Sequence, residues 1–318
     1  SSEISAVYDS YADKVVITYR DEGNSSYGTA IVGTVSGTSI SFGDPVVFNS
    51  ANSQYTDVVS IGNGKVVVVY RDDGNSYKGT AIVGTISGNS ITFGGESQFN
   101  SNAGNWNAVT YDSTNDKVVV AYTDTGNSSR GYAIVGTVSG TSISFGSKAN
   151  VDTQTGSNEL SITYDSHNDR VVAIVGNFGK AYVGTVSGTD ITFDSGTVFN
   201  TDGIGSSSES WAIFDPDTNQ VVVTYRNNSN SNYGTANVIS ITGTNASSDN
   251  FIGIAGEAIS NAATGTVTIV GGINASQSGL TAGQRYFVQK DGSLSTTADT
   301  PSLLAGTAIS ATKLIVKR

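Results

Sequence analysis

The sequence predicts an all-β fold, and three observations lead to that prediction. Apolar residues make up 37% of the 318 residues, while 38 glycines and many Ser, Thr and Asn indicate numerous tight turns. Before residue 250 the only leucine is Leu160, so Val and Ile, which suit a pleated sheet, supply the apolar side chains. One valine-rich phrase, AIVGTVSGTSISFG, fills residues 30–43 and returns unchanged at 133–146, with variants at 81–94 and 181–194.

A larger unit repeats with a period of about 50 residues. An apolar run that begins with two valines, or a close relative of it, recurs at intervals of 50 to 53 residues. Periods of this length are typical of propellers and solenoids, in which one unit cannot bury its apolar face alone. The five copies of this run start at Val15, Val66, Val118, Val171 and Val221.

Each unit contains four strand-like runs, which are clearest in the third copy. DSTND joins the first two, because Asp and Asn favour turns, and SGTS makes a tight hairpin between the last two. Alternation in that hairpin places Val138, Ile143 and Phe145 on one face, whereas the second run is apolar almost throughout, as in strands covered on both faces. The expected strands are 107–112, 117–124, 132–140 and 142–149.

Four antiparallel strands in each of five units predict a five-bladed β-propeller over residues 1–245. The repeated phrase is then scaffold, since equivalent strands pack against equivalent neighbours. An elongated stack of hairpins is the alternative architecture. The fifth copy breaks into TNASSDN where its fourth strand should follow, and we expect either upstream residues or NFIGIAG at 250–256 to complete that blade.

Residues 246–318 have a different composition and predict a small β-barrel or sandwich module. Five of the six leucines of the chain lie here, and Asp291-Gly292 marks a hairpin. A module of this size has a small core, so we expect it to dock onto other proteins or to form a homo-oligomer. Because the sequence has no methionine, even at position 1, we also expect upstream sequence.

Composition excludes several classes of function and site. The net charge of −11 opposes binding to nucleic acid, and the absence of any apolar run of about 18 residues opposes membrane insertion. Without cysteine, and with His167 as the only histidine, in a turn, the chain has almost no material for a zinc site or a Ser-His-Asp triad. Asp215, Asp217 and Asn219 alternate as calcium ligands can, but turn chemistry explains them better. We expect no metal and no cofactor.

One face of the predicted propeller is the candidate binding surface. The loops that join strands two and three lie on the same face as the connections between blades, and aromatic residues occur there among Asn, Ser, Asp and Gly. Aromatic faces stack on sugars while amides and carboxylates bond hydroxyls, although these residues could equally be loop residues that fill gaps between blades. The aromatic candidates are Tyr27, Tyr55, Tyr77, Trp106, Trp211 and Tyr233.

Alignment of the repeats adds a set of residues that should surround the mouth of a central channel. Each lies five residues before the recurring YD position or its equivalent. This set consists of Glu3, Tyr55, Trp106, Glu159 and Glu209.

The sequence also resembles structural proteins of phages, particularly marine ones. The run GLTAGQRYFVQKDGSLSTTADTPSLLAGTAISATKLIVKR at 279–318 is similar to their C-terminal modules, and IAGEAISNAATGTVTIVGG at 254–272 is similar to small domains of capsid-decorating proteins. The repeat YDSTNDKVVVAYTD, with the following GYAIVGTVSG, resembles repeats of the same kind of protein. This resemblance implies a virion-surface or tail-fibre role and carries over no catalytic residue.

We therefore expect a non-catalytic protein, located on a virion surface or outside the cell, whose propeller recognises a host surface glycan or receptor. Its C-terminal module would contact other virion or fibre proteins. A purely structural spacer without a ligand is the second hypothesis. A sialidase-like glycoside hydrolase is the third, because the loops DEGNSS, DDGNSY and DTGNSS partly resemble the Asp-box, although no pair of catalytic carboxylates can be singled out.

Overall fold

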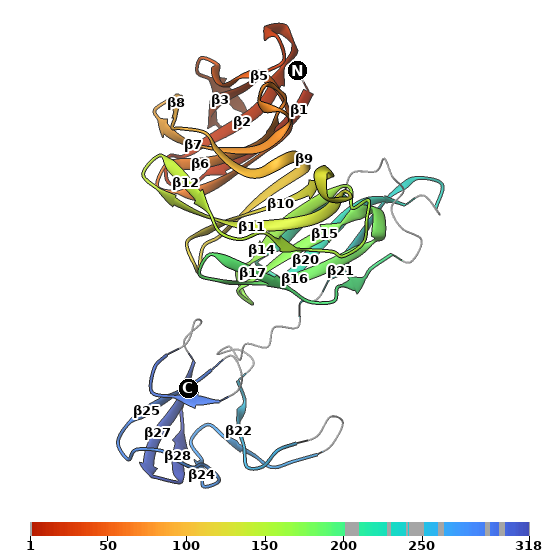
Figure 1. Cartoon of the computed structure of the whole chain (residues 1–318). Helices are drawn as coiled ribbons and strands as arrows, with labels where there is room; N and C mark the ends of the chain where they lie inside the picture. The colour runs from red at the N-terminus through yellow and green to blue at the C-terminus, as the bar shows by residue number, and fades with distance from the viewer. Residues whose placement is uncertain are drawn as a thin grey trace. The chain divides into compact units, whose positions relative to one another are not determined.

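The computed structural model describes residues 2–200, 210–227, 230–239, 241, 251–259, 264–289, 293–298 and 303–317, which form an all-β protein. Its sheets are antiparallel, and the chain divides into two compact units, Ser1–Ile241 and Thr242–Arg318 (Figure 1). Within these residue ranges no helix has the length and apolar character needed to span a bilayer.

The first unit consists of five successive repeats, each folded as one sheet region. Repeat 1 contains β1 (Ser2–Asp9), β2 (Lys14–Asp21), β3 (Tyr27–Ser36) and β4 (Ser39–Phe42). Repeat 2 contains β5 (Val46–Gly62), β6 (Lys65–Asp72), β7 (Lys78–Ser87) and β8 (Ser90–Phe93). Repeat 3 contains β9 (Ser97–Asp112), β10 (Lys117–Asp124), β11 (Arg130–Ser139), β12 (Ser142–Phe145) and β13 (Ala149–Asn150).

The last two repeats follow the same order of strands. Repeat 4 contains β14 (Leu160–Asp165), β15 (Arg170–Val175), β16 (Lys180–Ser187), β17 (Asp190–Phe193) and β18 (Thr197–Val198). Repeat 5 contains β19 (Ser210–Asp215), β20 (Gln220–Asn227) and β21 (Tyr233–Ile239). The four strands predicted for the third repeat are therefore present, although β9 begins ten residues earlier than predicted and β12 ends four residues earlier.

Two long strands connect the first three repeats. The first part of β5 pairs with β3 of repeat 1, as in the pair Ala30 and Val46, and its second part pairs with β6 of repeat 2. The strand β9 joins repeats 2 and 3 in the same way. We call the first strand of each repeat its inner strand. Because β5 and β9 each pair with two successive repeats, hydrogen bonding is continuous from β1 to β13.

The second strands of repeats 2, 3 and 4 are covered on both faces, as their apolar runs predict. Val67 and Val69 of β6 pack with Val118 of repeat 3, whereas the intervening side chain of Val68 packs with Val16 of repeat 1. Because successive side chains of a strand point to opposite faces, one strand contributes to two cores. Four such cores lie between successive repeats, from the pair of repeats 1 and 2 to the pair of repeats 4 and 5.

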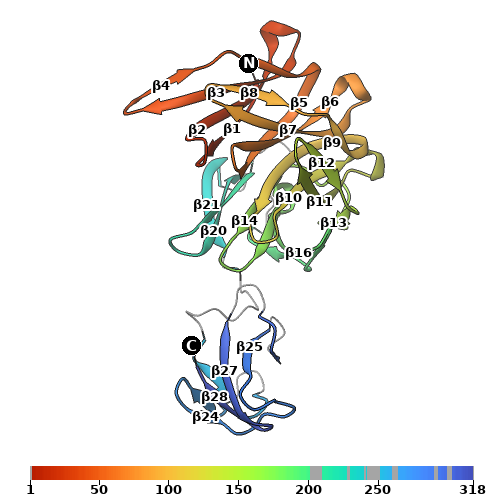
Figure 2. The same cartoon turned by 90° about the vertical axis from the view of Figure 1, so that its left-hand side faces the viewer.

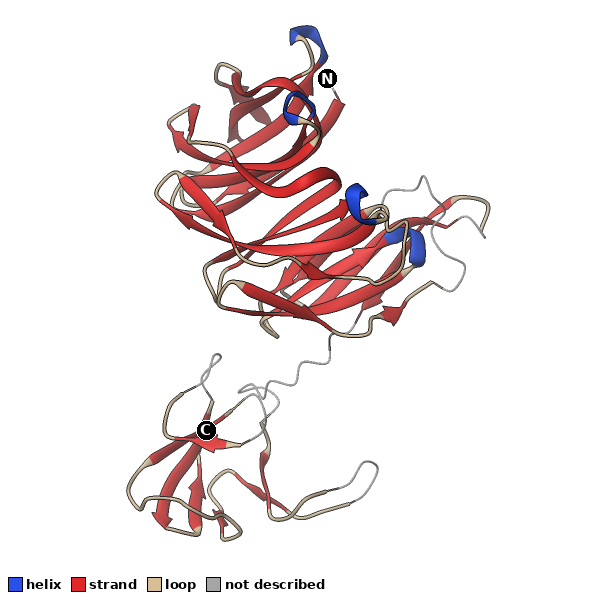
Figure 3. Cartoon of the chain, in the orientation of Figure 1, coloured by secondary structure: helices blue, strands red, loops and turns tan. Residues whose placement is uncertain are grey.

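Four short 3-10 helices connect the second and third strands of the first four repeats at corresponding ends of the sheets (Figure 3). In the first three, an Asp at the start accepts a hydrogen bond from the backbone N–H of a Gly two residues later, at 3.0–3.1 Å. These bonds explain the repeated Asp-x-Gly-Asn motif as turn chemistry. The helices are η1 (Glu22–Asn24), η2 (Asp73–Asn75), η3 (Thr125–Asn127) and η4 (Gly176–Phe178).

The outer faces of the first and last repeats lack the cover that the other repeats have. Ile40 in repeat 1 is 43% exposed, whereas its equivalent Ile91 in repeat 2 is 1% exposed. In repeat 5, Ile213 and Val238 are 66% and 65% exposed. Figure 2 shows β20 and β21 on the same side of the unit as β1 and β2. Among the described residues, however, no strand pairing joins repeat 5 to repeat 1, so the sheets do not form a closed circle of paired strands.

Of the two alternatives for completing the last repeat, the one that uses residues 250–256 is wrong. The sheet of repeat 5 has three strands among the described residues, and β22 (Gly253–Ala255) pairs with β23 (Val267–Ile269) instead. Those two strands belong to the second unit, which has its own apolar partners for them, such as Leu280 and Tyr286 beside Ile254.

The second unit contains that hairpin and a separate five-stranded sheet with the order β24-β28-β27-β25-β26. The sequence Asp291-Gly292, predicted as a hairpin turn, lies outside the described residues, but Phe287 and Ser295 on either side of it are paired. Leu314 is fully buried and shares one apolar core with Ala305 and Ala308. The strands of the sheet are β24 (Ile273–Asn274), β25 (Arg285–Val288), β26 (Leu294–Ser295), β27 (Leu304–Ser310) and β28 (Lys313–Val316).

Candidate functional site

The first four repeats share an unusual backbone conformation at one position in or next to the inner strand, which is the first strand of each repeat. Glu3, Tyr55, Trp106 and Glu159 occupy equivalent positions, and all four have φ between 51° and 59°. Residues other than glycine seldom adopt this left-handed region, which costs roughly 1 kcal/mol or more for each residue. In the first three repeats the same position coincides with a break in the strand register, as expected for a bulge that redirects one side chain.

These bulges direct their side chains into a single pocket of about 320 Å³. Residues from the inner strands of all five repeats line it, including the first and the last. Because repeats 1 and 5 contribute to the same pocket, the five sheets curve around it and do not extend in a line. The lining residues are Glu3, Ile4, Tyr55, Thr56, Asp57, Trp106, Asn107, Ala108, Glu159, Leu160, Ser161, Ile162, Ser210, Trp211 and Ala212. We call this the central pocket.

An aromatic pair forms one part of the wall of the central pocket. The ring centroids of Tyr55 and Trp106 lie 5.2 Å apart, and the ring planes are tilted by 46°. The guanidinium carbon of Arg71 lies 5.0 Å from the centroid of the Tyr55 ring and 5.3 Å from that of Tyr77. Tilted aromatic pairs and cation–π contacts of this kind are favourable, so the pair is held from behind by Arg71.

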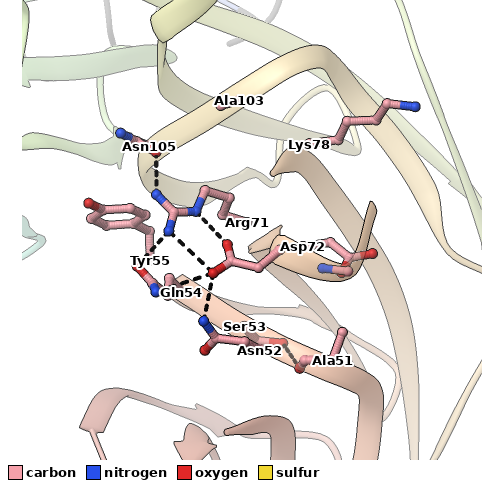
Figure 4. Close-up of polar contacts among 12 residues, drawn as sticks. Ala51, Asn52, Ser53, Gln54, Tyr55, Arg71, Asp72, Lys78, Ala103 and Asn105 are labelled. Atoms are coloured by element: carbon pink, nitrogen blue, oxygen red, sulfur yellow. Dashed lines mark hydrogen bonds and ion pairs between the residues drawn. The ribbon is translucent and has the colours of Figure 1, made fainter. Parts of the chain in front are cut away.

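Arg71 also binds the side chains of the residues that precede the two aromatic residues (Figure 4). Its guanidinium donates hydrogen bonds to the side-chain oxygens of Gln54 at 2.7 Å and Asn105 at 2.8 Å. These two residues immediately precede Tyr55 and Trp106. A 2.7 Å ion pair with Asp73, in which both side chains are mostly buried, completes the arrangement. Arg71 thus connects repeats 2 and 3 at the point where both aromatic side chains enter the central pocket.

Three carboxyl side chains line the central pocket. The Glu3 carboxylate accepts a hydrogen bond from the backbone N–H of Tyr55 at 2.9 Å, and Glu159 is 3% exposed. Asp57 accepts hydrogen bonds from the Ser5 hydroxyl at 2.7 Å and from the N–H groups of Val58 and Val109 at 2.9 Å. Burial raises the pKa of the Asp57 carboxyl, and these three donors oppose that effect.

Polar side chains next to the bulges also line the central pocket. Asn107, Thr56 and Ser161 are more than nine-tenths buried. Within the described residues, both side-chain amide atoms of Asn107 and the hydroxyls of Thr56 and Ser161 have no hydrogen-bond partner. Unsatisfied buried polar groups are rare in proteins and often mark functional sites. Together they offer donors and acceptors to a polar ligand.

The structure brings together five of the residues that the sequence analysis selected. Glu3, Tyr55, Trp106, Glu159 and Trp211 line the central pocket. Glu209 lies outside the described residues. Three further candidates, Tyr27, Tyr77 and Tyr233, do not line it.

Those three tyrosines have other surroundings. Tyr27 begins β3 and pairs with Asn52, Tyr77 is exposed beside Arg71, and Tyr233 is exposed at the start of β21. They were selected because their loops join strands two and three and therefore lie on one face of the repeats. That criterion does not say how far a residue lies from the central pocket.

Sequence reasoning missed Asp57, Asn107, Thr56 and Ser161. Their signal was the position one or two residues after the aligned set, because this part of each inner strand also faces the central pocket. The turn residues behave as the sequence analysis expected. The backbone N–H of His167 donates to Asp165, and that of Asp217 donates to Asp215, both at 3.0 Å. In the part of the chain that the structure describes, no three His, Cys, Asp or Glu side chains are grouped so as to hold a metal ion.

Comparison with known proteins gives fold relatives only. No family model matches the chain, and no curated protein matches it. Among solved structures, a protein from Lactobacillus plantarum is 13% identical, with 98% of this chain and 84% of that chain covered and a TM-score of 0.54. A Bacteroides uniformis protein described as a "putative 6-phosphogluconolactonase" is 12% identical, with 98% and 85% covered and a TM-score of 0.55.

A further similar structure is the lectin SapL1 in complex with alpha methyl fucoside, with 16% identity, 74% of this chain and 76% of that chain covered, and a TM-score of 0.48. At such identities the likeness concerns the fold, which is all-β and resembles that of β-propeller proteins. It does not transfer an activity.

The prediction that this chain is not an enzyme is contradicted by one of these fold comparisons. That prediction rested on the lack of an assignable pair of catalytic carboxylates and on a resemblance that carries over no catalytic residue. The Bacteroides uniformis structure, described as a "putative 6-phosphogluconolactonase", has a similar fold over almost the whole of this chain. The repeated sheets therefore give no reason to exclude catalysis.

Proposed function

We propose that the chain is a carbohydrate-binding protein and that its central pocket receives a glycan. The observation that carries the proposal is the combination of an aromatic wall, formed by Tyr55 and Trp106, with the buried, unpartnered amide of Asn107 in one pocket. A sugar ring presents C–H groups that stack on an aromatic face and hydroxyls that exchange hydrogen bonds with amides and carboxylates. A neutral apolar ligand would leave the Asn107 amide without a partner, which is costly.

The size of the central pocket agrees with this class of ligand. Its volume of about 320 Å³ lies at the lower end of the range for small-molecule sites. It therefore suits a short glycan or the end of a longer one. Trp211 is 58% exposed at the edge of the pocket and offers a further aromatic surface to a sugar residue that extends from it.

We also propose that the first unit is a five-bladed propeller. Five sheets that curve around one pocket and pack face to face support a five-bladed propeller, with the junction of repeats 5 and 1 as its seam. The location on a virion surface or fibre, with a host glycan as the target, stays a prediction from the sequence resemblance.

The proposal is tested by measuring the binding of the full chain to a glycan array and comparing two variants. Trp106→Ala removes half of the aromatic wall and should abolish binding to every glycan that the unmodified chain retains. Tyr233→Ala removes a tyrosine that is 65% exposed and lies away from the central pocket, so it should bind as the unmodified chain does.

The retained glycans should then be incubated with the chain and examined for cleavage, because similar folds include an enzyme assignment. If the Trp106→Ala variant still binds these glycans, the binding site does not lie in the central pocket. The absence of binding to any glycan would refute the proposal and favour a structural role.

A further inference from the structure

We infer that the glycan bound in the central pocket carries a free amino group, so that the ligand class is an amino sugar in its ammonium form. This inference rests on the proposed function, because it specifies the ligand of the same pocket. Its first support is the charge of the lining. Glu3, Asp57 and Glu159 line the central pocket, whereas no Lys, Arg or His occurs among the described residues that do so.

The distribution of charge excludes anionic sugars and favours cationic ones. The carboxylate of a sialic or uronic acid would lie close to Glu3 and Glu159 and would find no Lys, Arg or His among the described lining residues, and burial strengthens such repulsion. An ammonium group in the same place would be attracted by both carboxylates. The formal net charge of −11 acts in the same direction, because it raises the local concentration of cations around the chain.

The aromatic side chains of the pocket add a second, independent attraction. Cations are drawn to the faces of Trp and Tyr rings, and Tyr55, Trp106 and Trp211 all line the central pocket. The protein itself uses this contact, since Arg71 lies 5.0 Å from the centroid of the Tyr55 ring. Arg71 is neutralised by its 2.7 Å ion pair with Asp73, and it is not part of the lining, so it does not oppose a cation inside the pocket.

The unpartnered polar atoms distinguish a primary ammonium from a quaternary one. The Asn107 side-chain oxygen and the hydroxyls of Thr56 and Ser161 can accept hydrogen bonds, and they are buried without partners among the described residues. A primary ammonium has three N–H donors to offer them, whereas the trimethylammonium of choline has none. An amino sugar therefore satisfies the carboxylates, the aromatic faces and the free acceptors at once.

The test compares oligosaccharides that differ only at carbon 2. Calorimetry of the full chain, at a pH where the amine is protonated, should use glucosamine oligomers, their N-acetylated counterparts and the corresponding glucose oligomers of equal length and linkage. We expect the glucosamine oligomer to bind about tenfold more tightly than either neutral oligomer, because both the carboxylates and the aromatic faces favour the charge. The preference should decrease as salt is added.

Two variants assign the preference to the central pocket. Glu159→Gln should reduce it by removing one buried carboxylate. Trp211→Leu should also reduce it, because an apolar side chain remains but the aromatic face is lost, and this exposed position tolerates substitution. Glu22→Gln removes a carboxylate outside the pocket and should leave the preference unchanged. If Glu159→Gln does not fold, Trp211→Leu alone decides.

The possible outcomes distinguish a failure of this inference from a failure of the proposed function. Equal affinity for the three oligomers, or a preference for the N-acetylated one, overturns the inference while carbohydrate binding stands. Tight binding of phosphocholine without binding of the glucosamine oligomer overturns it as well, in favour of a quaternary ammonium. If no glycan of any kind binds, both the inference and the proposed function fail.

Discussion

Asp57 should make the stability of the first unit dependent on pH, because its carboxyl joins three inner strands. It accepts hydrogen bonds from Ser5 of β1, from Val58 of its own strand and from Val109 of β9. The substitution Asp57→Asn keeps the shape but replaces one acceptor with a donor. One backbone N–H then loses its partner, which should cost about 1–3 kcal/mol of unfolding free energy at low pH.

The cost of Asp57→Asn should shrink as the pH rises. Burial raises the pKa of the Asp57 carboxyl above that of the unfolded chain, so the folded state holds its proton more tightly. The stabilisation from this proton is fully present below the unfolded pKa, which is about 4 for an ordinary Asp, and is lost as the pH rises through the folded pKa. Each unit of difference between the two pKa values corresponds to about 1.4 kcal/mol. Asn does not titrate, so the variant should not show this loss.

Urea unfolding at a series of pH values between about 4 and 8 would measure this effect. Tryptophan fluorescence reports on the first unit alone, because Trp106 and Trp211 are the only tryptophans and both lie in it. The quantity of interest is the difference in unfolding free energy between Asp57→Asn and the unmodified chain, with Asp44→Asn as the control for an exposed carboxyl. A difference that does not change with pH would refute the reasoning about Asp57.

Three further predictions follow from particular contacts. A Cβ atom at Gly79 would lie 2.3 Å from the Phe99 ring, so Gly79→Ala should destabilise the first unit by about 1–3 kcal/mol in the same assay, whereas Gly95→Ala, with open space around it, should be close to neutral. Arg71→Met should weaken glycan binding on an array by releasing Gln54 and Asn105, whereas Arg20→Met, its equivalent in repeat 1, should not. Burial raises the pKa of Asp124, but hydrogen bonds from Lys148 and Asn102 outweigh it and the net pKa is lowered. Lys148→Met should therefore cost about 1 kcal/mol at pH 7, less than a buried pair would because Lys148 is partly exposed. This cost should diminish in melts as the pH falls below about 4, the unfolded pKa of Asp.

Much of the first unit could be predicted from its repeats. The period located the strands, and alternation correctly placed Val138, Ile143 and Phe145 in one core. Counting back from the aligned YD position found residues that lie together in the central pocket, because equivalent positions in curved repeats approach a common axis. The same logic failed for Tyr27, Tyr77 and Tyr233, since a loop can lie on the right face and still be far from that axis.

Other features depend on contacts that no period contains. Alignment of the five copies locates the positions of Asp57 and Asn107 but does not select these side chains, because each occurs in a single repeat. Arg71 has equivalents in Arg20 and Arg226, and alignment does not show that Arg71 contacts the aromatic pair. The two ends of the first unit differ from its middle because their outer faces have no neighbouring repeat, although their sequences resemble the covered ones. The sequence pattern could not predict the pairing of β22 with β23 either, because NFIGIAG has the apolar character of a strand that either unit could have used.

The central claim is that the first and last repeats meet across one pocket, and a distance between them tests it most directly. The chain has no cysteine, so Ile4→Cys and Trp211→Cys, both at exposed positions, can each carry a spin label. Because both residues line a pocket of about 320 Å³, pulsed dipolar spectroscopy should give a distance of about 20 Å or less. Five sheets stacked in a line, about 10 Å apart, would place the labels about 40 Å apart, and that result would contradict the account.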